Sequence, residues 1–126
     1  MDRRSFITLL GAGASVLVLP DLNGATSMYG LIGRMRAIPG QRAALAAILL
    51  EGTSAMPGCL SYVIAEDPAD ADALWVTEVW DSAASHQGSL ALPAVKDAIA
   101  RGRPLIAGFD SRTETRPLGG HGLATG

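Results

Sequence analysis

The chain has 126 residues, of which 48% are hydrophobic and 17% are charged, and its formal net charge is -2. This length suits one domain of ordinary size, and the composition is unlike that of disordered chains, which are poor in hydrophobic residues. Runs of lysine or arginine interleaved with aromatic residues do not occur in the sequence, so nucleic acid is not an expected partner.

Residues 1–20 differ in composition from the rest of the chain. Arg3-Arg4 precedes an uncharged apolar run that continues to Pro20. Paired arginines followed by an apolar run too short to span a membrane comfortably are typical of a signal peptide, and the arrangement resembles the twin-arginine export signal. We expect residues 1–27 to form a signal peptide and linker, the protein to be periplasmic or otherwise exported, and the membrane to be contacted only during export.

Two further expectations concern the ends of the domain. An alternative start of translation at Met28 stays open, and it would leave the protein in the cytoplasm. The domain itself is expected over residues 28–116. The tail over residues 117–126 is rich in glycine and lacks periodicity, so we expect it to be mobile.

The first half of the domain alternates between strand and helix patterns. Polar and apolar residues alternate from Tyr29 to the Pro39-Gly40 turn, which predicts a strand. Leucine and isoleucine at helical spacing among alanines predict a helix over residues 41–52. A second strand is expected over residues 59–65, after a break in the chain at a Met-Pro-Gly segment.

The second half begins with a turn over residues 66–72 that contains three aspartates but lacks the spacing, central glycine and final glutamate of a calcium loop. A third strand follows over residues 74–80 and makes a hairpin with the second. Helical segments are expected from Ala83 onward with an interruption at Pro93, and a closing strand is expected over residues 106–115.

The predicted order, β-α-β-β-α-β, is typical of an α+β ferredoxin-like fold, in which both helices cover one face of an antiparallel sheet. The two hairpin strands carry apolar residues toward both faces, among them Leu60, Tyr62, Ile64, Leu74 and Trp80. An exposed face of this kind needs cover. We therefore expect a homodimer in which the sheet of a second copy packs against it.

Four segments carry a family resemblance: Tyr29-Gly30-Leu31-Ile32-Gly33, Pro39-Gly40, Met56-Pro57-Gly58-Cys59-Leu60 and Thr77-Glu78-Val79-Trp80-Asp81-Ser82. Their order and spacing resemble those of the antibiotic biosynthesis monooxygenase family, in particular its quinol monooxygenase branch, over nearly all of residues 29–116. The resemblance implies a dimeric α+β barrel. It also implies oxidation of a quinol or phenolic aromatic substrate by O2 without metal, flavin or haem as a cofactor.

Such chemistry requires a dry cavity, a group that accepts the substrate's hydroxyl proton, and stabilisation of the resulting anion. Glu78 and Trp80 share one face of the third strand, and His86 in the next helix lies close enough along the chain to join them. We take His86 as the candidate base, with Glu78 as a second catalytic candidate. The alternatives are a surface histidine and a structural ion pair between Glu78 and Arg34, Arg36 or Arg112.

The resemblance has one departure at this position. The histidine common in this helix of the quinol monooxygenase branch falls three residues later, where this chain has Ser89. His86 is therefore displaced by about one helical turn from it. His121 lies in the tail, and we assign it no role.

Substrate binding is assigned to Trp80, Tyr62 and Arg34. Trp80 and Tyr62 offer aromatic surface, and Arg34 offers a cation for a phenolate. Packing and a solvated strand face explain the same residues without a ligand. Trp75 is expected on the opposite face of the strand from Trp80. The single cysteine, Cys59, excludes an intramolecular disulfide and is interpreted as a buried structural thiol.

Two other functions compete with oxygenation. A non-catalytic binding module would use the same dimeric cavity to hold a small aromatic or lipid-like ligand, and replacing His86 would leave its affinity unchanged. Haem degradation in the same fold would need an asparagine near a haem-anchoring histidine. The only asparagine is Asn23, outside the predicted domain, which disfavours that function.

Overall fold

The structure is a computed structural model that describes residues 27–124. Its elements are β1 (Tyr29–Ala37), α2 (Arg42–Gly52), β2 (Cys59–Glu66), β3 (Ala73–Trp80), α3 (Ala83–Ser89), α4 (Pro93–Gly102), the 3-10 turn η1 (Arg103–Leu105) and β4 (Ile106–Thr115). The predicted order is confirmed, including the division of the second helical region before Pro93. The predicted signal peptide lies outside the described residues. No helix in the described part of the chain has the length and apolar character needed to cross a membrane.

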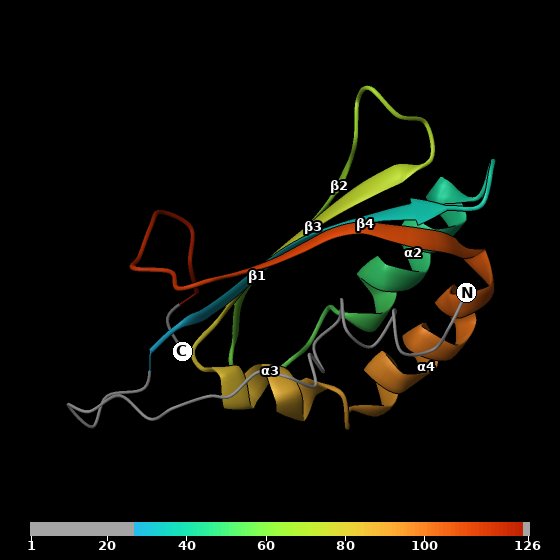
Figure 1. Cartoon of the computed structure of the whole chain (residues 1–126). Helices are drawn as coiled ribbons and strands as arrows, with labels where there is room; N and C mark the ends of the chain where they lie inside the picture. The colour runs from blue at the N-terminus through green and yellow to red at the C-terminus, as the bar shows by residue number, and fades with distance from the viewer. Residues whose placement is uncertain (1–26, 125–126) are drawn as a thin grey trace.

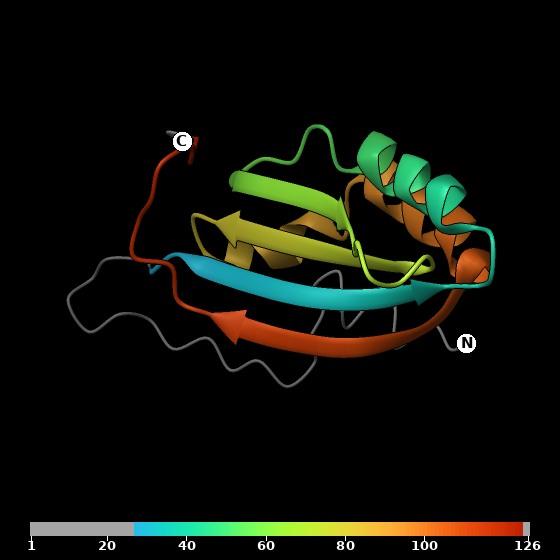
Figure 2. The same ribbon diagram turned by 90° about the horizontal axis from the view of Figure 1, so that it is seen from above.

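The four strands form one antiparallel sheet in the order β2-β3-β1-β4. The three α-helices lie on one side of this sheet, as Figures 1 and 2 show. This arrangement confirms the ferredoxin-like α+β fold. We call the face toward the helices the inner face and the opposite one the outer face.

Strand alternation and helical periodicity together build the core on the inner face. Leu31 and Met35 of β1 are fully buried, as are Leu74 and Val76 of β3, because alternate residues of a strand share a face. Met35 packs with Leu74 and Val76, whereas Leu31 packs with Trp80. Both long helices bury a stripe with a spacing of three to four residues. The buried helix residues are Leu45, Leu49 and Gly52 in α2 and Val95, Ala98, Ile99 and Gly102 in α4.

Helices α2 and α4 approach each other closely at Gly52. A Cβ atom added there would overlap the Cβ of Ala98 and lie 3.1 Å from the carbonyl oxygen of Ala94. We therefore expect Gly52→Ala to lower the free energy of unfolding by about 1–3 kcal/mol, because the helices must move apart. Urea unfolding followed by circular dichroism measures this change.

Gly88 in α3 provides a matched control for the Gly52 substitution. An added Cβ at Gly88 meets no atom within 4 Å. Gly88→Ala should raise stability by roughly 0.5–1 kcal/mol, because alanine loses less conformational entropy than glycine in a helix. Equal effects of the two substitutions would contradict the close approach of α2 and α4.

The described part of the tail returns across the end of the sheet from β4 toward β2 (Figure 2). Pro117 lies against Gly30 of β1, where an added Cβ would come within 2.9 Å of the proline ring. The backbone N–H of Ala124 donates to the carbonyl oxygen of Leu60 at 3.0 Å. Residues 117–124 therefore contact both β1 and β2 in this structure, and the mobility of this tail stays a prediction.

Candidate active site

Strand β3 places Glu78 and Trp80 side by side on the inner face, each 1% exposed. The two residues are two apart in the strand, so their side chains point the same way. The indole Nε1–H of Trp80 donates to Oε1 of Glu78 at 3.0 Å. This hydrogen bond gives the buried carboxyl group one partner and fixes the direction in which it points.

Helix α3 brings His86 to the same place. The helix begins directly after β3, where the Ser82 side chain caps it by accepting the backbone N–H of Ser85. His86 is 1% exposed, and its Nε2 lies 3.6 Å from Oε1 of Glu78. The predicted convergence of His86, Glu78 and Trp80 is therefore present, and the alternative of a surface histidine is wrong.

Ser89, which stands where the quinol monooxygenase branch has its histidine, shares the buried side of α3 with His86. Its hydroxyl group donates to the backbone carbonyl oxygen of His86 at 2.6 Å. Ser89 thus contacts the backbone of His86. In this chain His86, one helical turn before Ser89, provides the buried imidazole of α3.

The environment of Glu78 favours its neutral form. Burial raises the pKa of Glu78 from its ordinary value of 4.5 to about 8, and the hydrogen bond from Trp80 and the positive charge of Arg112 oppose this rise only in part. Glu78 therefore keeps its proton at neutral pH. Its second oxygen, Oε2, is buried and has no hydrogen-bond partner among the described residues.

Tyr62 of β2 stands opposite Glu78 in the strand register, so both side chains lie on the inner face. The Tyr62 hydroxyl group is buried and, within residues 27–124, has no hydrogen-bond partner. Burial and the nearby Glu78 carboxyl hold the pKa of Tyr62 well above its ordinary value. The hydroxyl group is therefore a permanent hydrogen-bond donor.

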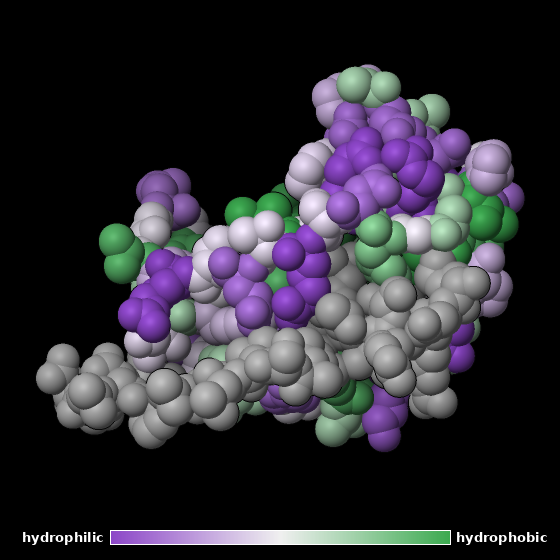
Figure 3. Space-filling view, viewed as in Figure 1, coloured by the Kyte–Doolittle hydropathy of each residue, from purple (hydrophilic) through white to green (hydrophobic). Residues whose placement is uncertain are grey.

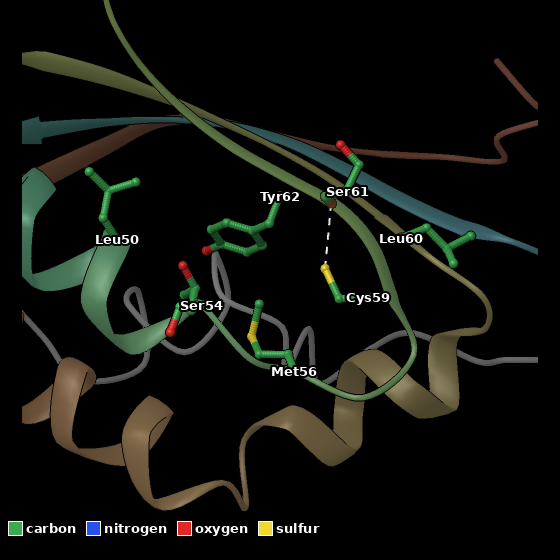
Figure 4. Close-up of a pocket in the computed structure, with 8 residues that line it drawn as sticks. Leu50, Ser54, Met56, Cys59, Leu60, Ser61 and Tyr62 are labelled. Atoms are coloured by element: carbon green, nitrogen blue, oxygen red, sulfur yellow. Dashed lines mark hydrogen bonds between the residues drawn. The ribbon is translucent and has the colours of Figure 1, made fainter. Parts of the chain in front are cut away.

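A cavity of about 380 Å³ opens beside Tyr62 between α2 and the start of β2. Figure 4 shows Tyr62, Met56 and Cys59 turned toward the space between β2 and the helices. The cavity is lined by Leu50, Thr53, Ser54, Met56, Cys59, Leu60, Ser61 and Tyr62. Met56, Cys59 and Tyr62 also pack against the buried cluster that contains Trp80. Glu78, Trp80 and His86 do not line the cavity, and Trp80 is connected to it through these three lining residues.

Comparison with known proteins identifies the family of the chain. Residues 28–101 match the sequence profile of the antibiotic biosynthesis monooxygenase family. The chain belongs to this family. No curated protein matches the chain.

Solved structures support the same assignment. A candidate antibiotic biosynthesis monooxygenase from Chloroflexus aurantiacus J-10-fl is 69% identical, with a TM-score of 0.77, over 78% of this chain and 100% of that chain. The protein Rv0793 from Mycobacterium tuberculosis is 25% identical, with a TM-score of 0.64, over 75% of this chain and 99% of that one. A candidate antibiotic biosynthesis monooxygenase from Caulobacter crescentus CB15 is 19% identical over 75% and 92%, with a TM-score of 0.67, and shows the shared fold.

In this member of the antibiotic biosynthesis monooxygenase family, Arg34 lies apart from the other predicted site residues. It is on the outer face, where it forms ion pairs with Asp67, Asp70 and Asp110 and stacks over the Trp75 ring at 5.7 Å. Hydrophilic residues gather around the β2–β3 loop in Figure 3. The structure thus gives Arg34 a role in tying this loop to the sheet, and the structural interpretation of this residue fits its position.

Residues that the sequence did not assign to the site also contribute to it. Tyr29 stacks on His86 with a ring-centroid distance of 4.7 Å. Arg112, which the sequence had named as a possible ion-pair partner of Glu78, supplies the positive charge felt by Glu78. Cys59 lines the cavity as a thiol, because burial raises its pKa to about 11. Local sequence patterns do not indicate that Tyr29 belongs to the site; only the pairing of β1 with β3, which puts Tyr29 opposite Trp80, does so. Among residues 27–124, no group of three or more His, Cys, Asp or Glu side chains could hold a metal ion.

Proposed function

We propose that this protein oxidises a quinol or phenolic aromatic substrate with O2, with His86 as the acceptor of the substrate's hydroxyl proton. The observation that carries this proposal is the buried pair of titratable groups, Glu78 and His86, 3.6 Å apart, together with a cavity lined by Tyr62, the strand partner of Glu78. Titratable groups in a buried, perturbed environment beside a cavity are typical of a catalytic site.

Two buried polar atoms near this pair support binding of an oxygen-bearing ligand. The Tyr62 hydroxyl group and Oε2 of Glu78 are both buried without a partner among the described residues, and they belong to paired positions of β2 and β3. A buried polar group without a partner costs about 1–3 kcal/mol. A substrate hydroxyl or carbonyl group placed between them recovers part of that cost and orients the ring.

The protonation state of Glu78 supports His86 as the base. Glu78, with a pKa of about 8, still holds its proton at neutral pH and cannot accept another. A neutral imidazole can accept the hydroxyl proton, and the resulting phenolate is rich enough in electrons to react with O2. For a phenol with a free ring position, one oxygen atom of O2 enters the ring to give a quinone. The other oxygen leaves as water with two hydrogens from the substrate, which supplies all the electrons.

Dissolved oxygen measured with a panel of quinols and phenols tests this proposal. We expect substrate-dependent oxygen uptake that a chelator does not reduce, with one water and one quinone formed per O2. The absence of uptake above the autoxidation rate across the panel would contradict the oxygenase function. Binding of the same compounds without turnover would then identify a small-molecule binding module.

We also infer that two copies associate through their outer faces. On this face Ile32 of the inner strand β1 is 37% exposed, and Val63 of the edge strand β2 is 53% exposed. Apolar side chains exposed in a sheet favour cover by a second layer. The inferred dimer would place sheet against sheet, as in the α+β barrel that the family resemblance implies.

Val63→Glu tests the inferred dimer. A carboxylate that replaces an apolar side chain within the interface is costly to bury, so the variant should sediment as a monomer at concentrations where the parent sediments as a dimer. Leu118→Glu is the matched control, because Leu118 is 94% exposed but lies in the tail. It should remain dimeric. A monomeric parent protein, or dissociation of both variants alike, would count against the outer face as the interface.

A further inference from the structure

Tyr29 has a position that its role as a core residue does not fully explain. It opens β1 directly opposite Trp80 in the register, and it is 8% exposed on the inner face. Its ring stacks on the imidazole of His86, with centroids 4.7 Å apart and planes inclined by 28°. The Trp80 ring lies 5.3 Å from the same imidazole at an angle of 59°. Two rings on paired strands therefore bracket His86.

The other end of Tyr29 is anchored to β4. Its hydroxyl group donates to Oε2 of Glu114 at 2.7 Å and accepts from Nη2 of Arg112 at 3.4 Å. Arg112 and Glu114 form an ion pair at 3.8 Å. Burial and the carboxylate of Glu114 raise the pKa of Tyr29, so the hydroxyl group keeps its proton and remains a donor. The ring is thus held at its hydroxyl end while its face rests on the imidazole.

Contact with Glu78 does not by itself set the orientation of this imidazole. The separation of 3.6 Å between Nε2 and Oε1 is longer than a hydrogen bond, and rotation about the second side-chain torsion of histidine is broad. A flat ring stacked on the imidazole restricts that rotation. Because the nitrogen of a base must lie within about 3.2 Å of the oxygen atom that carries the proton, a small rotation decides whether the substrate is reached.

We propose that Tyr29 is a positioning residue. Anchored by Glu114 and Arg112, its ring holds the His86 imidazole with Nε2 directed toward Glu78. This inference rests on the proposed role of His86 as the base, and it adds a chain of contacts from β4 at the sheet edge to that base. Tyr29 itself does not touch the substrate in this arrangement.

Long-range proton–nitrogen NMR of the full chain tests the proposal without any substrate. The sequence contains only two histidines, so exposed His121 in the tail serves as an internal reference for the signals of His86. In Tyr29→Leu, which removes the stacked ring, the side-chain nitrogen shifts of His86 should move toward those of His121. In Tyr29→Phe, which keeps the ring and loses the anchor, they should move in the same direction by a smaller amount.

Kinetics provide a second readout. With a substrate in hand, Tyr29→Leu should lower kcat about tenfold and leave KM within about twofold, because misplacement of the base slows chemistry more than binding. Trp75→Phe is the matched control, since Trp75 lies in β3 with its side chain on the outer face. It should change neither the His86 signals nor kcat.

The outcomes separate the parts of the proposal. His86 signals that coincide with those of the parent in both Tyr29 variants would overturn it. Unchanged signals in Tyr29→Phe would overturn the anchoring by Glu114 and Arg112, and this variant alone decides the matter if Tyr29→Leu does not fold. The His86 signals could shift in the Tyr29 variants although the parent protein consumes no oxygen. That result would support the positioning by Tyr29 and refute the proposed function instead.

Discussion

Replacing His86 with alanine should lower the rate of substrate-dependent oxygen uptake about a hundredfold or more, the usual contribution of general-base catalysis. The imidazole lies 3.6 Å from Glu78, and Glu78 holds its proton at neutral pH. The substitution removes the imidazole, and protonated Glu78 cannot accept the substrate's proton in its place. Stopped-flow and steady-state oxygen measurements on parent and variant give the ratio of rates.

Two controls make this result specific. His121→Ala removes the other histidine, which lies exposed in the tail, and should leave the rate unchanged. His86→Asn leaves less empty space than alanine between the two aromatic rings and should lose a similar rate without the cost of a large cavity. A His86 variant that is folded and retains the parent rate would place the proton acceptor elsewhere.

The free energy of unfolding should fall as the pH rises from about 4.5 to about 8 because of Glu78. Burial raises the pKa of this group from 4.5 to about 8, so the folded state binds the proton more tightly than the unfolded state does. The stabilising contribution is complete below pH 4.5 and is lost as the pH rises through 8. A shift of this size corresponds to on the order of a few kcal/mol over the whole window.

Glu78→Gln should remove this pH dependence, because glutamine does not titrate and its carbonyl oxygen can still accept the Trp80 indole N–H. Urea unfolding at several pH values between 4.5 and 8 measures the slope for parent and variant. Asp97→Asn, at an exposed carboxylate of α4 paired with Arg101, is the matched control and should keep the slope of the parent. Equal slopes in Glu78→Gln and the parent would show that Glu78 is ionised in the folded protein.

The amino-acid sequence by itself determined the order of the elements and the faces of the regular strands. Both follow from local periodicity, because a strand repeats every two residues and a helix every 3.6. That rule put Glu78 and Trp80 on one face and Trp75 on the other, as the structure has them. The sequence also carried the family resemblance in segments that lie within the domain, and it marked His86 and Glu78 as the residues able to exchange protons.

Strand register and bulges were decided by the tertiary structure alone. A register shift between Cys59 and Ser61 leaves Leu60 without a partner in β3, so Cys59 and Tyr62 lie on the same face although they are three residues apart. A strict period of two would instead place Leu60 and Tyr62 on one face. Such a bulge depends on how β2 meets β3, and local periodicity does not contain that information.

Pairing between strands that are far apart in the sequence likewise determined which residues the cations and aromatic rings contact. Arg34 was predicted at the site, but loop and strand aspartates far along the chain hold it on the outer face. Tyr29 reached His86 because β1 pairs with β3 at Trp80, and its hydroxyl group met Glu114 because β1 also pairs with β4. Sequence periodicity assigns a residue to a face of its strand, whereas only the packed sheet determines which distant residue lies beside it.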